Sequence, residues 1–107
     1  MSVFEQREQA FESRFFHEEE IRFRATARRN KLLGLWAAER MGLAGDDASE
    51  YARSVVQADL IKMGEDDVLL KLVGDMSAKG LPVSPDEVRK SMGEFMGVAI
   101  AQVHAEL

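Results

Sequence analysis

Residues 84–103 read SPDEVRKSMGEFMGVAIAQV and carry the clearest helix signal in the chain. Ser84 can cap the helix N-terminus, the proline after it suits the first helical position, and Glu87 stands where a capping box requires a carboxylate. Apolar residues then follow at steps of three or four and share one helical stripe: Val88, Met92, Phe95, Ala99 and Val103. Gly93 and Gly97 lower the helix propensity, and a close helix–helix approach would be one reason to tolerate them. The pattern predicts an amphipathic helix that packs on a core.

Two further helices precede this one. Asp47 and Glu50 have the spacing of a capping box and open the first helix, which ends near Gly64. Its apolar face comprises Tyr51, Ala52, Val55, Val56, Leu60 and Met63. Acidic residues at 65–67 open the second helix, where the helix dipole favours negative charge, and Gly80 ends it. Its apolar face comprises Val68, Leu69, Leu72, Val73 and Met76.

The first 44 residues contain no proline, and no glycine before Gly34. They predict either one long helix or two helices joined near residues 17–22. Within them, residues 31–43 have the composition of a core helix, and Gly42 is a natural stop. The sequence therefore predicts an all-α fold, a small four-helix bundle whose first helix is long or broken and whose N-terminal segment is loosely held. We expect the core to include Leu32, Leu35, Trp36, Tyr51, Val55, Leu69, Leu72, Val88 and Phe95.

Length, composition and charge exclude several classes of protein. The 107 residues fit one domain, are 46% hydrophobic and contain no cysteine, which excludes disulfides and thiolate metal sites. We expect no signal peptide and no membrane insertion, because no apolar run approaches the roughly 18 residues of a membrane span. Residues 46–107 hold 6 Lys or Arg against 12 Asp or Glu, a net charge of −6. Such an acidic half repels nucleic acid.

Residues 1–30 differ from the rest, because they hold five of the six phenylalanines and almost no aliphatic residues. Phe4, Glu8, Phe11 and Phe15 share one helical face by their spacing. A helix with so thin an aromatic stripe is marginal alone, since most helical stability comes from packing. Two interpretations stay open here. Either the stripe packs on the chain's own bundle, or the segment is loosely held and folds into a groove of a partner.

No residue stands in a catalytic setting, and we expect no enzyme activity. The chain has no phosphate-binding loop, no cysteine nucleophile and no recognisable catalytic Ser or His. His17 and Glu20 have a spacing seen in bundle metal sites, but the further ligands are missing, so we expect neither metal nor cofactor. The basic residues of segment 22–31 spread around a helix, and the glutamates at 18–20 offer them i,i+4 partners. A solvated, salt-bridged face is the favoured interpretation of this run.

Residues 27–39, ARRNKLLGLWAAE, are too particular for a generic core helix. This run resembles the signature of the zeta-subunit family, the inhibitor of the F-type ATP synthase in α-proteobacteria. Residues 7–12, 51–59 and 64–68 agree with the same family in the same order and spacing. The resemblance covers nearly the whole chain, and the last helix is similar in pattern more than in residues.

The resemblance implies a regulatory protein whose N-terminal segment inserts into the catalytic head of the ATP synthase, at an α/β interface beside the central stalk. There it would block rotation and ATP hydrolysis. Residues 1–18 would form the inhibitory segment and residues 19–107 the bundle domain. The residues expected to bind the partner are the anchors Phe4, Phe11 and Phe15 and the polar residues Arg7, Glu8, Glu12 and Arg14. The protein would be cytoplasmic and peripheral to the inner membrane through the ATP synthase.

The alternative function is that of a helical adaptor or RNA-associated regulator that binds through the Arg-rich segment 22–31. A basic binder of this kind would retard nucleic acid with a strong dependence on salt. The two functions therefore place the binding surface on neighbouring stretches of the first 31 residues.

Overall fold

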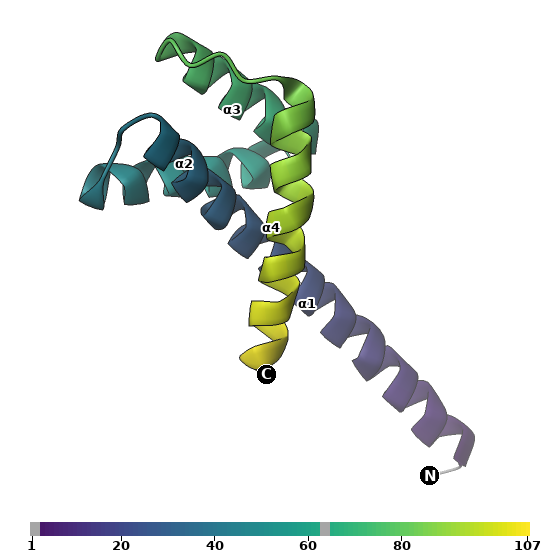
Figure 1. Cartoon of the computed structure of the whole chain (residues 1–107). Coiled ribbons are helices and arrows are strands. Elements are labelled where there is room, and N and C mark those ends of the chain that lie inside the picture. The colour runs from purple at the N-terminus through teal and green to yellow at the C-terminus, as the bar shows by residue number, and fades with distance from the viewer. Residues whose placement is uncertain (1–2, 63–64) are drawn as a thin grey trace.

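The computed structural model describes the backbone of residues 3–62 and 65–107, and the side chains of residues 18–59 and 66–107. Over these residues the helices are α1 at Val3–Arg40, α2 at Gly45–Lys62, α3 at Glu65–Ala78 and α4 at Pro85–Ala105 (Figure 1). The predicted all-α, four-helix fold is confirmed. Across the described part of the chain, no helix combines the length and the apolar character needed to cross a bilayer.

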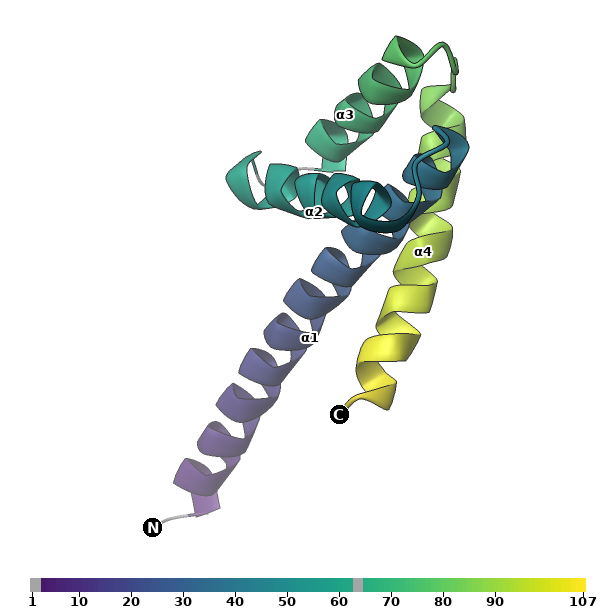
Figure 2. The same cartoon turned by 90° about the vertical axis from the view of Figure 1, so that its left-hand side faces the viewer.

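α1 is one long helix, which decides between the two predictions for the first 44 residues. It runs without a break through residues 17–22. Its C-terminal half lies against the other helices, whereas its N-terminal end extends beyond them in both views (Figures 1 and 2). At about 1.5 Å per residue, its 38 residues span about 57 Å. α1 therefore accounts for most of the 64 Å long axis of the molecule.

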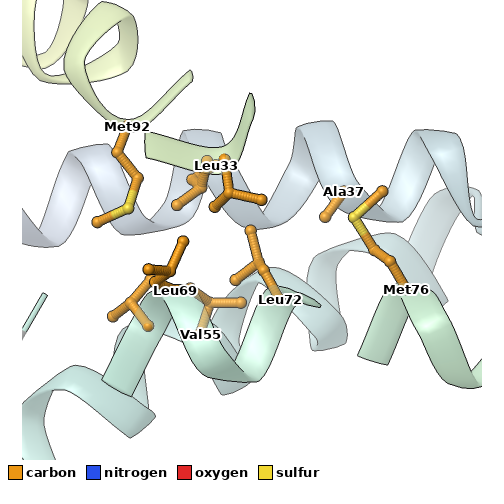
Figure 3. Packing of buried hydrophobic residues seen from close by; sticks show 9 residues of the cluster. Leu33, Ala37, Val55, Leu69, Leu72, Met76 and Met92 are labelled. Atoms are coloured by element: carbon orange, nitrogen blue, oxygen red, sulfur yellow. The ribbon is translucent and has the colours of Figure 1, made fainter. Parts of the chain in front are cut away.

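The main core lies where the four helices meet. Its buried side chains are Leu33, Ala37, Val55, Val68, Leu69, Leu72, Met76, Val88 and Met92. Leu33 of α1 faces Val55 of α2 and Leu72 of α3 (Figure 3). The three large aromatic side chains of the expected core are only partly buried and pack against the edge of this cluster: Trp36, Tyr51 and Phe95.

The buried face of α1 is centred on Leu33 and not on the flanking leucines. Leu33 has no exposed surface, whereas Leu32 and Leu35 are only partly buried. The difference arises because α2 and α4 both pack on α1 and do so from different sides. Leu32 lies on the α4 side, where it packs against a second, smaller cluster formed by Ala25, Ala99 and Val103.

Local hydrogen bonds end and begin the helices where the sequence predicts. At the end of α1, Leu43 N donates to Ala38 O at 2.9 Å. Gly42 lies between them with φ at +79°, which completes a Schellman motif that favours glycine. The start of α4 is capped by Ser84, whose Oγ accepts a hydrogen bond from Glu87 N at 3.1 Å. These caps keep the connections short and so fix the packing order of the helices.

α1 and α2 approach each other closely where they cross at Gly34. A Cβ built on Gly34 would lie 2.6 Å from Ala52 Cα, which is a backbone atom that cannot swing aside. The expectation of a close approach at Gly93 and Gly97 is wrong. Both are exposed, and a Cβ built on either meets no atom within 4 Å.

Gly34→Ala should destabilise the protein, whereas Gly93→Ala should stabilise it. The first change forces α1 and α2 apart, at a cost of about 1–3 kcal/mol. The second adds helix propensity in open space and gains about 0.5–1 kcal/mol. Urea unfolding followed by circular dichroism measures both. The crossing would be looser than described if the two variants shifted the midpoint in the same direction.

Candidate partner-binding site

The candidate site is the part of α1 that extends beyond the bundle, residues 3–20, which we call the projecting segment. Next to it, Ile21 still packs against the cluster of Ala25 and Val103 on the α4 side. The side chains of residues 18–20 are exposed. All seven residues expected to bind a partner are in this segment: Phe4, Arg7, Glu8, Phe11, Glu12, Arg14 and Phe15. Their side chains lie outside the described residues, so their roles stay predictions.

The C-terminal end of α4 binds α1 directly behind the projecting segment. Arg28 Nη1 lies 2.7 Å from Glu106 Oε1, and Arg28 Nη2 donates to Glu106 Oε2 at 2.9 Å. Arg24 reaches the same carboxylate at 3.4 Å, and Arg28 also donates to Gln102 at 3.2 Å. The hydrogen bonds from Arg28 lower the pKa of Glu106. Because these side chains are partly exposed, the contact orients the helices more than it stabilises the fold.

A buried polar network joins α1 to α2. Arg29 and Asn30 are only 2% and 1% exposed. Arg29 Nε and Nη2 donate to Asn30 Oδ1 at 3.1 and 2.9 Å, and Asn30 Nδ2 donates to Asp59 Oδ2 at 2.8 Å. The Asn30 side chain thereby bridges the buried guanidinium of Arg29 and the carboxylate of Asp59 on the neighbouring helix. A hydrogen-bonded network of this kind favours one register of α1 against α2.

Tyr51 links α2 to α3. Its hydroxyl donates to Asp75 Oδ2 at 2.9 Å, and Lys71 Nζ lies 3.0 Å from the same oxygen. Burial and the hydrogen bond to Asp75 raise the pKa of Tyr51. The phenol is therefore protonated at neutral pH and acts as a hydrogen-bond donor between helices.

The basic residues of segment 22–31 do not form one accessible surface. Arg24 and Arg28 are held by the end of α4, and Arg29 is buried. Arg22 is exposed and pairs with a glutamate one turn earlier at 3.5 Å. A nucleic-acid binder needs its cations gathered and free to meet phosphates. The arrangement therefore disfavours the alternative function through this segment.

Three residues near the site were not predicted from the sequence. Phe23 is 62% exposed, and the aromatic composition of residues 1–30 was the only signal that pointed to it. Gln102 and Glu106 contact α1 across 74 to 82 positions of sequence. A contact between residues so far apart leaves no local pattern, so no periodicity could have revealed it.

Comparison with known proteins places the whole arrangement in one family. The model of the family described as ATPase inhibitor subunit zeta matches residues 1–102. A protein solved in solution by NMR is 46% identical and superposes with a TM-score of 0.70, over 81% of this chain and 99% of that one. No curated protein matches the chain.

Asn30→Ala should destabilise the bundle by about 2–4 kcal/mol, because it removes an acceptor from a buried guanidinium and the partner of Asp59. Lys31→Ala, at the next and exposed position, is the matched control and should stay within about 0.5 kcal/mol of wild type. Equilibrium unfolding in urea measures both. Equal midpoints for the two variants would show that the network carries no stability.

Glu106→Gln should remove a contribution to stability that depends on pH. The folded-state pKa of Glu106 is lowered from its ordinary value of 4.5. The carboxylate therefore stabilises the fold above that value, and the contribution is lost as the pH falls through the folded pKa. The gap in unfolding free energy between wild type and variant should be present at about pH 7 and should narrow in acid, as the pH falls below that ordinary value.

Chemical unfolding at neutral and at acid pH measures this gap. Glu94→Gln, at an exposed position on the same helix with no ion pair among the described residues, controls for the loss of one negative charge. A gap that stayed constant on acidification would contradict the role of Glu106.

Proposed function

The chain belongs to the family of ATPase inhibitor subunit zeta, and on that premise we propose that it inhibits ATP hydrolysis by the F-type ATP synthase. In this proposal the projecting segment inserts at a catalytic α/β interface of the head, beside the central stalk, and blocks rotation. The observation that carries the proposal is the shape of α1. One unbroken helix is packed in the bundle along one half and extends beyond it along the other (Figure 2).

A helix that is packed in a folded bundle along one half is well suited to enter a groove with its other half. An isolated segment of this length would have to nucleate its first turn, which is the unfavourable step of helix formation. Here the packed half of α1 supplies that nucleus, so each residue of the projecting segment only has to propagate the helix. The partner then spends less of its binding free energy on ordering the segment. The 18 residues from 3 to 20 reach about 27 Å, which is long enough to enter between two subunits.

The aromatic and charged residues of the projecting segment supply the proposed contacts. Phe4, Phe11 and Phe15 would be the anchors, since buried aromatic side chains usually carry most of an interface's energy. The four charged positions among them would make polar contacts at the rim: Arg7, Glu8, Glu12 and Arg14. The division between residues 1–18 and residues 19–107 is then one of partner contact and not of helix boundaries, because α1 is continuous across it.

Inhibition of this kind requires no chemistry. A helix that binds one rotational state of the head more tightly than the others traps that state, and each preference of about 1.4 kcal/mol is worth about tenfold in population. The bundle would stay outside the groove, because four packed helices are wider than a single helix. Held there, it would keep the segment at high local concentration. Through the ATP synthase the protein would be peripheral to the inner membrane and located in the cytoplasm.

Removal of residues 1–18 should abolish inhibition and leave the bundle folded. The full-length protein, the truncated protein and the double variant Phe11→Ala/Phe15→Ala are titrated against ATP hydrolysis by the purified catalytic head of the cognate ATP synthase. We expect full inhibition by the first, none by the second, and a loss of at least about tenfold in potency for the third. Undiminished inhibition by the truncated protein would contradict the proposal.

Thermal unfolding of the truncated protein is the control. In the described part of the chain, the core and the side chains packed against it begin at Ile21, which the truncation keeps, so we expect cooperative unfolding to persist. Loss of cooperative unfolding would mean that residues 1–18 belong to the fold and are not held ready for a partner.

A further inference from the structure

Among the described side chains, Phe23 is the one aromatic residue that is mostly exposed. It is 62% exposed, whereas Trp36, Tyr51 and Phe95 are at least partly covered. Aromatic side chains often anchor protein interfaces, so an exposed phenylalanine next to the proposed binding segment is a candidate contact. Its position in the fold explains why the chain itself leaves it uncovered.

Two nearby apolar residues on α1, Ile21 and Phe23, differ in burial. Ile21 packs against Ala25 and Val103 on the α4 side. Phe23 lies two residues further, about 200° around the helix, and so faces away from α4. It is seven residues before Asn30, about two turns along nearly the same face. Asn30 is covered by α2, but the contact with α2 does not reach Phe23.

We propose that Phe23 is an additional anchor for the catalytic head of the ATP synthase, so that the interface of the projecting segment continues past residue 18 to this side chain. The inference rests on the proposed function. α1 is continuous from Val3 to Arg40, so a groove that encloses residues 3–18 has its mouth about 7 Å from Phe23. The end of α4 at Arg24 and Arg28 then limits how far the helix can enter. Phe23 is the last aromatic residue before that limit.

The charges around Phe23 define the chemistry of the surface that would receive it. Glu18, Glu19 and Glu20 are exposed, and Glu19 pairs with Arg22. Within the described residues, Glu18 and Glu20 form no ion pair. Of these two, Glu20 lies three residues before Phe23 and nearer its face, so the matching surface on the partner is an apolar pocket with a basic side chain beside it. A second copy of this chain fits poorly, because a symmetric contact at Phe23 would bring two acidic clusters together.

Phe23→Ala in the full-length protein tests the inference. The variant is titrated against ATP hydrolysis by the purified catalytic head, beside Leu70→Ala as the matched control. Leu70 is 68% exposed on α3, so both changes remove an exposed apolar side chain. We expect Phe23→Ala to weaken inhibition by about tenfold or more, and Leu70→Ala to leave it unchanged. We expect neither substitution to lower the thermal unfolding temperature. Because alanine also raises helix propensity at position 23, a weakened helix could not explain a loss of inhibition.

The possible results of this titration distinguish a failure of the inference from a failure of the proposed function. Inhibition by wild type with equal potency for Phe23→Ala overturns the inference and leaves the proposed function standing. Absence of inhibition by wild type overturns the proposed function and the anchor with it. Sedimentation equilibrium of wild type and Phe23→Ala covers self-association: a dimer that dissociates on Phe23→Ala, with inhibition unchanged, would assign the side chain to a second copy and overturn the inference.

Discussion

The packing of the C-terminal half of α1 against α2 and α4 is the interaction on which the rest of the structure depends. α1 and α2 cross closely at Gly34, where the backbone of Ala52 leaves no room for a side chain. Around this point the core of Leu33 and its neighbours forms, the Arg29–Asn30–Asp59 network sets the register, and Glu106 holds the end of α4 on α1. All of these contacts involve residues of α1 that follow the projecting segment.

The same packing connects the fold to the proposed function. The bundle of residues 19–107 holds the C-terminal half of α1, and the helix continues beyond the bundle without a break. Because the C-terminal half of α1 packs against both α2 and α4, the direction of the projecting segment is fixed as well. In the proposed function, the partner would bind a helix that already points outward. The polar contacts of the packed half contribute orientation, while the apolar core contributes stability. In the proposed function, inhibition would then depend on the shape of α1 and on differential binding to the states of the catalytic head.

The local features of this fold could be predicted from the sequence, and the long-range contacts could not. Ser84, Glu87, Gly42 and Gly80 act through hydrogen bonds within a few residues, so the helix ends were visible as patterns. The central role of Leu33 and the close approach at Gly34 depend on where a second and a third helix cross, which periodicity in one helix does not encode. For the same reason the sequence wrongly suggested a close helix approach at Gly93 and Gly97. At the site, composition identified the aromatic segment, but the exposure of Phe23 and the contact of Glu106 needed the fold.

The measurement that tests the central claim most directly is hydrogen–deuterium exchange of the full-length protein, alone and in complex with the catalytic head of the ATP synthase. The account predicts that the head slows exchange at residues 3–20 and leaves α2, α3 and α4 as they are in the free protein. Protection confined to α3 or to the outer face of α4, with residues 3–20 exchanging as before, would contradict it.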